Sequence, residues 1–170
     1  MNRPGFIEWA LNIAAAVATR GDCTRRQVGA VILDRNNWPV AVGYNGSYPG
    51  GPSCLKGECP RGKHYEKPAV ALPGGEFRVF LCSCGNVLPC PDAVPPGSSY
   101  DTGPGTCHSV HAELNAILHV LDGTRMDSGI MVVTERPCDG CLKIMRSTAL
   151  SKVVWRDDTG THFRHWPFER

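Results

Sequence analysis

Two short motifs near the end of the chain could together hold a metal ion and move protons. The first is His111-Ala112-Glu113, and the second is Pro137-Cys138-Asp139-Gly140-Cys141. Three protein ligands, His111, Cys138 and Cys141, leave the fourth position of a tetrahedral zinc site open for water, which is the catalytic form of such a site. Glu113 can point into the same cavity without binding the metal. There it can take a proton from the water and pass it to a substrate.

Each motif taken alone has a simpler explanation. H-x-E is common in proteins, and a lone C-x-x-C pair can be a redox pair or half of a structural zinc site. Here the two motifs are expected at the starts of two helices with a strand between them. Thiols at a helix start lie near unsatisfied N–H groups, which favour the thiolate form that binds metal. Together the motifs match the signature of zinc-dependent nucleobase and nucleotide deaminases.

The chain resembles the deoxycytidylate deaminases of the cytidine deaminase superfamily over most of its length outside an insert. The similarity covers residues 23–31 and 43–47, and also 111–117 and 134–141, which contain the two metal motifs. HAELNAI and GYNGS together are more specific than the metal motifs, because relatives that act on nucleic acids usually lack the GYNGS loop. The resemblance implies an enzyme that hydrolyses dCMP to dUMP and ammonia, with Glu113 as the proton shuttle.

The resemblance also implies two substrate-binding residues and a regulated assembly. Asn45 is expected to contact the sugar-phosphate portion of the substrate, and Arg26 to help recognise the phosphate. The glycines around Asn45 allow close approach to a ligand. The alternatives are a plain turn after a hairpin for Asn45 and a solvated surface charge for Arg26. A homo-oligomer is expected, with a nucleoside triphosphate such as dCTP or dTTP as an effector.

Other functions stay open. A 5-substituted dCMP, another cytosine nucleotide or nucleoside, or an adenosine in tRNA could be the substrate. Long nucleic acid is not expected, because 18 Lys and Arg nearly balance 16 Asp and Glu. A non-catalytic zinc module that binds a partner is the second alternative. The intact Glu113 argues against it, since a purely structural site needs no proton shuttle.

Seven further cysteines could hold additional zinc. The resemblance implies a structural site of four thiolates, which would join both ends of the insert to the core: Cys23, Cys54, Cys59 and Cys107. Cys107 stands one position closer to the HAE motif than the family pattern has it, so His108 is an alternative ligand. The alternative to this site is a set of ordinary buried thiols.

The remaining three cysteines lie in the segment CSCGNVLPC: Cys82, Cys84 and Cys90. C-x-C followed by glycine resembles the turn of a zinc knuckle, and His64 or another cysteine could supply a fourth ligand. The alternative is a small accessory hairpin with free thiols. The polar loop at 98–101, which leads to the HAE motif, is expected to cover the pocket and influence base specificity. In all, one catalytic zinc and one or two structural zinc ions are expected.

The elements around these motifs alternate between helices and strands. Apolar residues at helical spacing predict helices over 5–19, 111–121 and 138–150. Short apolar runs predict strands over 27–33, 38–44, 130–134 and 152–155. The order α-β-β-insert-α-β-α-β predicts an α/β fold, a three-layer α-β-α sandwich. The resemblance makes this a cytidine deaminase-like sandwich with a mixed sheet. The final residues, 156–170, show no clear pattern.

The insert differs from the rest of the chain in composition. Residues 45–106 are rich in Gly, Pro, Ser and Cys, and only 77–81 is typical of a strand. A structureless loop of this length is unusual in a compact domain, so metal is the expected source of its order. We therefore expect one deaminase domain over 1–170, with a cysteine-rich zinc-binding insert over 52–107.

Composition sets the broad class. With 42% hydrophobic and 20% charged residues, the 170-residue chain resembles an ordinary globular domain. Nine cysteines suit metal thiolates better than a disulfide framework, because the number is odd and no secretory leader is evident. No apolar run reaches the length of a membrane span. A cytoplasmic protein is expected.

Overall fold

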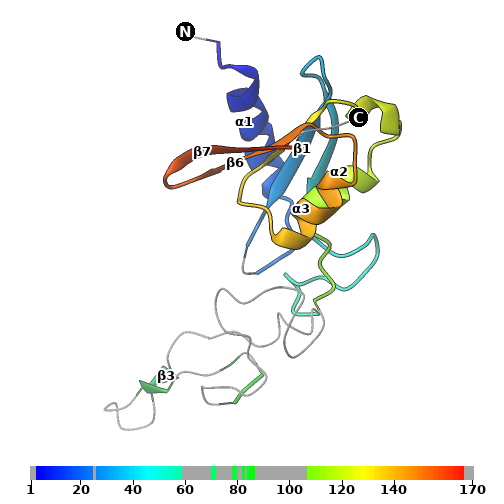
Figure 1. The fold of residues 1–170 in the computed structure, drawn as a ribbon. Coiled ribbons are helices and arrows are strands. Elements are labelled where there is room, and N and C mark those ends of the chain that lie inside the picture. Colours follow the sequence, from blue (N-terminus) through cyan, green and yellow to red (C-terminus); the bar gives the residue numbers. More distant parts are fainter. Residues whose placement is uncertain are drawn as a thin grey trace. The chain divides into compact units, whose positions relative to one another are not determined.

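The computed structural model describes residues 3–24, 26–58, 70–71, 78–79, 82, 84–86 and 107–166. The chain divides into two units, drawn in Figure 1 and treated separately below. The first consists of Met1–Gly46 and Val110–Arg170, and the second is Ser47–Ser109.

A five-stranded mixed sheet forms the centre of the first unit. Its order is β2 (Pro39–Tyr44), β1 (Gly29–Leu33), β5 (Ile130–Val133), β6 (Lys152–Asp157) and β7 (Gly160–His165). β5 and β6 run parallel and are joined through a helix, whereas the other neighbours pair antiparallel. All five residues of β1 are buried, which explains why its sequence is a continuous apolar run.

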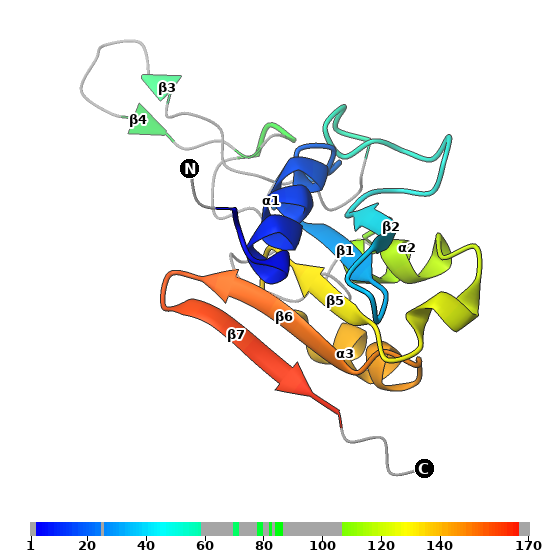
Figure 2. The same ribbon diagram turned by 90° about the horizontal axis from the view of Figure 1, so that it is seen from above.

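Helices cover both faces of this sheet and produce three layers (Figure 2). α1 (Phe6–Ala18) packs on one face, and α2 (Ala112–Leu118) and α3 (Asp139–Arg146) lie on the other. Alternate residues of the central strands point to opposite faces: Val132 and Val154 join the α1 core, while Val133 and Val153 join the α2 and α3 core. The predicted α-β-α sandwich with a mixed sheet is confirmed.

Two helices are shorter than their apolar spacing predicts. α2 ends at Leu118, and a 3-10 helix, η1 (Gly123–Met126), follows it. The carboxylate of Asp122 accepts the backbone N–H of Thr124 at 3.0 Å, which starts a new turn. α3 ends at Arg146 because hydroxyl side chains bond the last carbonyls, with Thr148 Oγ1 donating to the oxygen of Met145 at 2.6 Å.

The second unit contains the predicted insert. Its regular structure within the described residues is a short antiparallel pair, β3 (Val70–Ala71) and β4 (Arg78–Val79). β4 falls inside the strand predicted over 77–81. The polar loop predicted over 98–101 lies outside the described residues.

Candidate metal centre

His111 and Cys138 occupy the same position on two different helices. Each is the residue immediately before the first helical residue, His111 before α2 and Cys138 before α3. Both have extended backbone, with ψ of 151° and 164°. The Sγ of Cys138 accepts the backbone N–H of Cys141 at 3.4 Å, so the thiol takes the capping place that a hydroxyl usually takes. The start of α3 thus favours a negatively charged sulfur.

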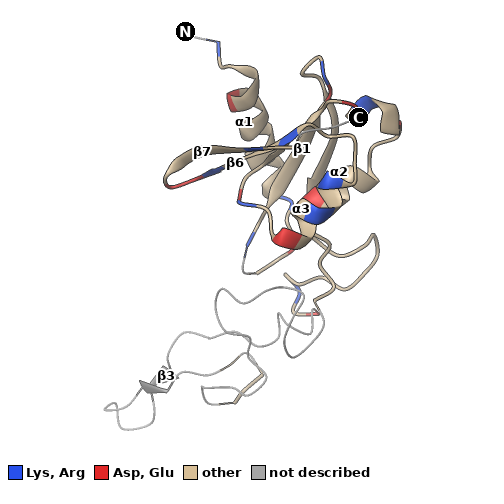
Figure 3. Cartoon of the chain, viewed as in Figure 1, with Lys and Arg blue, Asp and Glu red and all other residues tan. Residues whose placement is uncertain are grey.

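α3 also carries charges that suit its dipole (Figure 3). Asp139 lies in its first turn, and Lys143 and Arg146 lie in its last turn. An acid at the start and bases at the end of a helix stabilise it. The helix that carries both cysteines is therefore well defined by local interactions.

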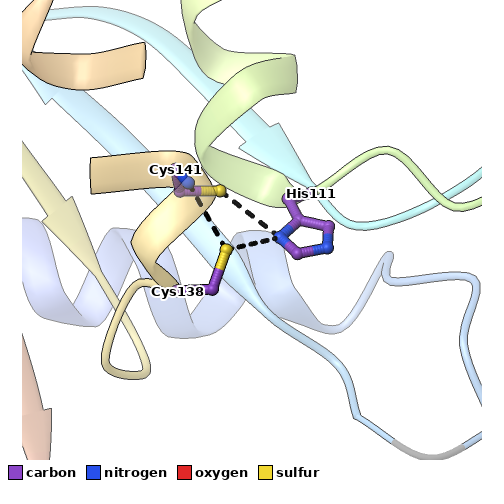
Figure 4. Close-up of side chains that lie close together, drawn as sticks. All are labelled: His111, Cys138 and Cys141. Atoms are coloured by element: carbon purple, nitrogen blue, oxygen red, sulfur yellow. Dashed lines mark hydrogen bonds between the residues drawn. The ribbon is translucent and has the colours of Figure 1, made fainter. Parts of the chain in front are cut away.

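The three predicted ligands meet at one point (Figure 4). The Nδ1 of His111 lies 3.5 Å from the Sγ of Cys138 and 3.3 Å from the Sγ of Cys141. The three donor atoms lie within 4.8 Å of one another, and no other group of three or more such residues exists in the described part of the chain. Zn–S and Zn–N bonds of ordinary length at a tetrahedral angle place N and S about 3.6 Å apart. The spacing therefore fits one zinc ion.

Glu113 is buried beside these donors. Its residue is only 4% exposed, and burial raises the pKa of its carboxyl against the opposing effects of its own N–H and of His111. Burial also raises the pKa of the Cys141 thiol, and the charges of Glu113 and Cys138 add to that effect. Three groups that can become anions thus lie together, and two of them, Glu113 and Cys141, are buried, which is costly unless a cation is present. The donor set fits zinc in this respect too.

Arg26 and Asn45, predicted to bind the substrate, lie in contact with each other. The amide Nδ2 of Asn45 donates to the carbonyl oxygen of Arg26 at 2.8 Å, and its Oδ1 accepts the N–H of Val28 at 2.8 Å. Arg26 forms an ion pair with Glu135, with 3.1 Å between Nη1 and Oε2. Asn45 therefore shapes the chain that presents Arg26, and the phosphate-binding role of both residues stays a prediction.

Glu135 has a role that the sequence did not suggest. It lies three residues before Cys138, and its charge contributes to raising the pKa of Glu113. Its ion pair neutralises an acid close to the buried carboxyl. The only sequence signal was an acidic residue just before the second metal motif.

The other cysteines lie in both units. Cys23 belongs to the first unit and is 4% exposed, whereas Cys54 belongs to the second and is 6% exposed. Cys107 is half-buried, and Cys59 lies outside the described residues. The predicted four-thiolate site therefore stays a prediction, as does His108 as the alternative ligand.

Cys84 lies in a turn within the CSCG motif. The N–H of Gly85 donates to the carbonyl oxygen of Cys82 at 2.9 Å, and Gly85 has a φ of +97°, which favours glycine. Cys82 is fully buried and Cys84 is exposed. Cys90 and His64 lie outside the described residues, so a zinc ion at this turn also stays a prediction.

An α/β sheet that brings one imidazole, two thiols and a buried carboxyl to two helix starts is typical of metal-dependent hydrolases. Comparison with known proteins is consistent with this class. The family described as the cytidine and deoxycytidylate deaminase zinc-binding region matches residues 5–156. The deoxycytidylate deaminase of Mycobacterium phage D29 is 32% identical over 155 residues, which cover 91% of this chain and 97% of that protein.

Two further similarities agree. The deoxycytidylate deaminase of Enterobacteria phage T4 is 32% identical over 146 residues, which cover 85% of this chain and 74% of that protein. The crystal structure of apo dCMP deaminase from the cyanophage S-TIM5 has a TM-score of 0.50 at 19% identity, covering 91% of this chain and 85% of that one. The latter similarity supports the fold alone.

This chain therefore belongs to the cytidine and deoxycytidylate deaminase family. The sequence predicted this family, the cytidine deaminase-like fold and an enzyme of a deaminating, zinc-binding family. All three predictions are confirmed. In the described residues, no helix is long and apolar enough to cross a membrane.

Proposed function

We propose that this chain is a zinc-dependent deaminase that converts dCMP and water to dUMP and ammonia. The observation that carries the proposal is the buried Glu113 beside the group of His111, Cys138 and Cys141. Its support from the comparisons is that relatives with 32% identity are named deoxycytidylate deaminases. One of these relatives aligns with this chain over 97% of its own length, so the comparison covers nearly the whole of that named enzyme.

Each of the four residues has a distinct role in this proposal. His111, Cys138 and Cys141 hold the zinc ion, which when bound supplies a Lewis acid that makes water nucleophilic near neutral pH. Glu113 accepts a proton from the attacking water. It gives that proton to the ring nitrogen N3, takes the second proton of the water from the new hydroxyl at C4, and gives it to the departing amino group, so that ammonia leaves and a carbonyl remains at C4.

Arg26 and Asn45 are proposed to bind the phosphate end of the substrate. The side chains of Arg26 and Glu135 are 54% and 39% exposed, so their ion pair contributes little to stability. A phosphate can therefore replace the carboxylate as the partner of Arg26. The amide of Asn45 makes two hydrogen bonds, but its oxygen can accept two and its nitrogen can donate two. Arg26 can therefore exchange its carboxylate partner for a phosphate, and Asn45 can contact a ligand while it keeps its present hydrogen bonds.

Several finer features belong to the same proposal. We propose a structural zinc ion held by Cys23, Cys54, Cys59 and Cys107, and a further one at Cys82, Cys84 and Cys90, within a zinc-binding insert over 52–107 of a single deaminase domain. A homo-oligomer, regulation by dCTP or dTTP and a cytoplasmic location are proposed as well. Metal analysis tests the number of zinc ions, and gel filtration with and without each triphosphate tests the oligomer and its response to the effectors.

The substrate is tested by ammonia release from a panel of cytosine compounds. The zinc-loaded protein is incubated with dCMP, CMP, dCTP, deoxycytidine and 5-methyl-dCMP under identical conditions. The highest kcat/KM is expected for dCMP. Preference for 5-methyl-dCMP or for deoxycytidine would replace the proposed substrate, and no ammonia from any of the five would overturn the proposed function.

A further inference from the structure

One pair of residues, at the start of β1 and the end of β2, is hydrogen-bonded to both of the segments that carry the proposed metal ligands. Gly29 of β1 and Tyr44 of β2 lie opposite each other in the sheet. The N–H of Gly29 donates to the hydroxyl of Thr134 at 3.1 Å, and its carbonyl oxygen accepts the N–H of Thr134 at 3.0 Å. The carbonyl oxygen of Tyr44 accepts the amide Nδ2 of Asn115 at 2.7 Å.

These bonds are possible because of where the pair lies. β2 is an edge strand of the five-stranded sheet, so among the described residues no neighbouring strand bonds the backbone groups on its outer side. Asn115 bonds one such carbonyl, that of Tyr44. Gly29 directs its own N–H to Thr134, on the other side of β1. The Gly29–Tyr44 pair is thus hydrogen-bonded to Thr134 on one flank and to Asn115 on the other.

Asn115 lies on the segment that carries His111 and Glu113. α2 has only seven residues, and no side chain caps its start. The backbone N–H of Asn115 closes the first turn by donating to the carbonyl oxygen of His111 at 2.9 Å. The same residue therefore joins the ligand-bearing turn to β2, and it does so through its side chain.

Two more contacts hold the same end of α2 against β2. Val110, the residue before His111, exchanges two backbone hydrogen bonds with Gly46, of 3.1 and 2.8 Å. A side chain at Gly43 would collide with the backbone of Ala112 and Ala116, so α2 approaches β2 as closely as glycine allows. The start of α2 has little freedom to shift relative to β2.

Thr134 lies on the segment that carries the cysteines. It follows β5 directly and precedes Cys138 by four residues, and Cys138 is the residue immediately before α3. Its two hydrogen bonds with Gly29 fix the point at which this segment leaves the sheet. The position of the sulfur atoms depends on that point.

We propose that Asn115 and Thr134 are positioning residues that set the distance between the two ligand-bearing helix starts through the Gly29–Tyr44 pair. The inference rests on the proposed function only in taking zinc as the metal. N···S separations of 3.3 and 3.5 Å leave a tolerance of a few tenths of an ångström around a tetrahedral ion. Loss of either contact lets one helix start move, and the metal affinity falls although no ligand has changed.

The test measures zinc affinity by competition with a chromogenic chelator, for the zinc ion that Cys141→Ser loses. Thr134→Val removes the hydroxyl at constant shape, Thr134→Ser keeps it, and Asn115→Ala removes the amide. Thr134→Val and Asn115→Ala are expected to weaken zinc binding about tenfold each, and Thr134→Ser less than threefold. The cobalt-substituted forms of the two weakened variants are expected to show altered d–d absorption.

Ser151→Ala is the matched control at the opposite end of β5 and β6. The hydroxyl of Ser151 donates to the carbonyl oxygen of Gly129 at 2.9 Å, a contact of the same kind far along the sheet from the metal centre. It is expected to lower thermal stability without changing zinc affinity. Equal loss of affinity in Ser151→Ala, or wild-type affinity in both Thr134→Val and Asn115→Ala, would overturn the proposal.

Because zinc binding is read without turnover, an inactive wild type that binds zinc at this centre overturns only the proposed function. A wild type that binds none there overturns both.

Discussion

The Nδ1 of His111 lies 3.3 Å from the Sγ of Cys141, although 30 residues separate the two along the chain. The topology of the sheet produces this contact. β5 ends where β1 begins, with Val133 opposite Ala30, and β2 ends there too, with Tyr44 opposite Gly29. α3 begins after β5, and α2 begins against the last residues of β2. Both helix starts therefore converge at one end of the sheet, on the same face.

Glu113→Gln tests the separation of proton transfer from metal binding. The amide fills the same volume but cannot accept a proton, so kcat for dCMP is expected to fall by about 10³-fold or more. The zinc content measured by atomic emission is expected to stay at the wild-type value. Glu8→Gln, an exposed acid on α1, is the control and should keep full activity. Loss of zinc together with activity in Glu113→Gln would contradict the assigned role.

Replacement of single cysteines tests how many zinc ions the protein holds. Wild type is expected to contain two or three zinc ions per chain, of which Cys141→Ser loses one together with all turnover. Cys54→Ser is expected to lose a different zinc ion and to lower the melting temperature, since a structural metal contributes to folding. A wild type with one zinc ion, absent from Cys141→Ser, would exclude the structural sites.

The core and the grouping of His111, Cys138 and Cys141 could be predicted from the sequence because their signals are local. The continuous apolar run that became β1 indicates a strand buried on both faces, and that is what Gly29–Leu33 forms. The two metal motifs need only their own spacing and a helix start. Between residues 47 and 109 the sequence predicted only one strand, over 77–81, and only a short β-pair is found there within the described residues.

β7 and the anchoring contacts could not be predicted, because their partners are distant in the sequence. Gly160–His165 is half-buried or exposed along its whole length, so it lacks the alternation that marks a strand. Its pairing with β6 depends on cross-strand contacts such as the stacking of Trp155 on His162, with ring centres 5.4 Å apart. Likewise, Asn115 and Thr134 bond backbone atoms of β2 and β1, and no side-chain pattern marks a backbone partner.

Arg26→Gln tests the proposed phosphate contact by comparing a nucleotide with its nucleoside. Loss of one charge-assisted contact is expected to raise KM for dCMP by roughly tenfold or more. KM for deoxycytidine, which has no phosphate, is expected to stay unchanged. Arg35→Gln, at the opposite end of β1, is the control. Equal effects of Arg26→Gln on both substrates would show that Arg26 acts by neutralising Glu135 instead.

Gly43→Ala tests the close approach of α2 to β2. The new methyl group would meet backbone atoms of Ala112 and Ala116, which cannot move aside as a side chain could. The free energy of unfolding is expected to fall by about 3 kcal/mol, the upper part of the range for overpacking. Gly123→Ala is the control, since a methyl group there meets no atom within 4 Å. Chemical denaturation of both variants measures the difference, and similar stability of the two would contradict the expectation.

Asp34→Asn tests a pH-dependent contribution to stability at the end of the sheet away from the metal centre. The N–H of Trp38 first, and then that of Asn36 and the guanidinium of Arg125, hold the pKa of the Asp34 carboxyl below its ordinary value although burial opposes them. The carboxylate accepts both N–H groups at 3.0 and 2.9 Å and lies 3.2 Å from Arg125.

The sign of the effect follows from the lowered pKa. Because the carboxyl binds its proton less readily in the folded than in the unfolded protein, its stabilisation is complete above the unfolded pKa of about 3.9. It disappears as the pH falls through the lower, folded pKa. Asp34→Asn is therefore expected to be less stable than wild type by about 1 kcal/mol at pH 7, and this difference is expected to shrink below about pH 4.

Urea denaturation from pH 7 to pH 3 measures this difference, and a chelator is present so that loss of zinc does not contribute. Asp158→Asn, in the exposed turn after β6, is the charge control, and a difference for Asp34→Asn that grows as the pH falls would contradict the assignment.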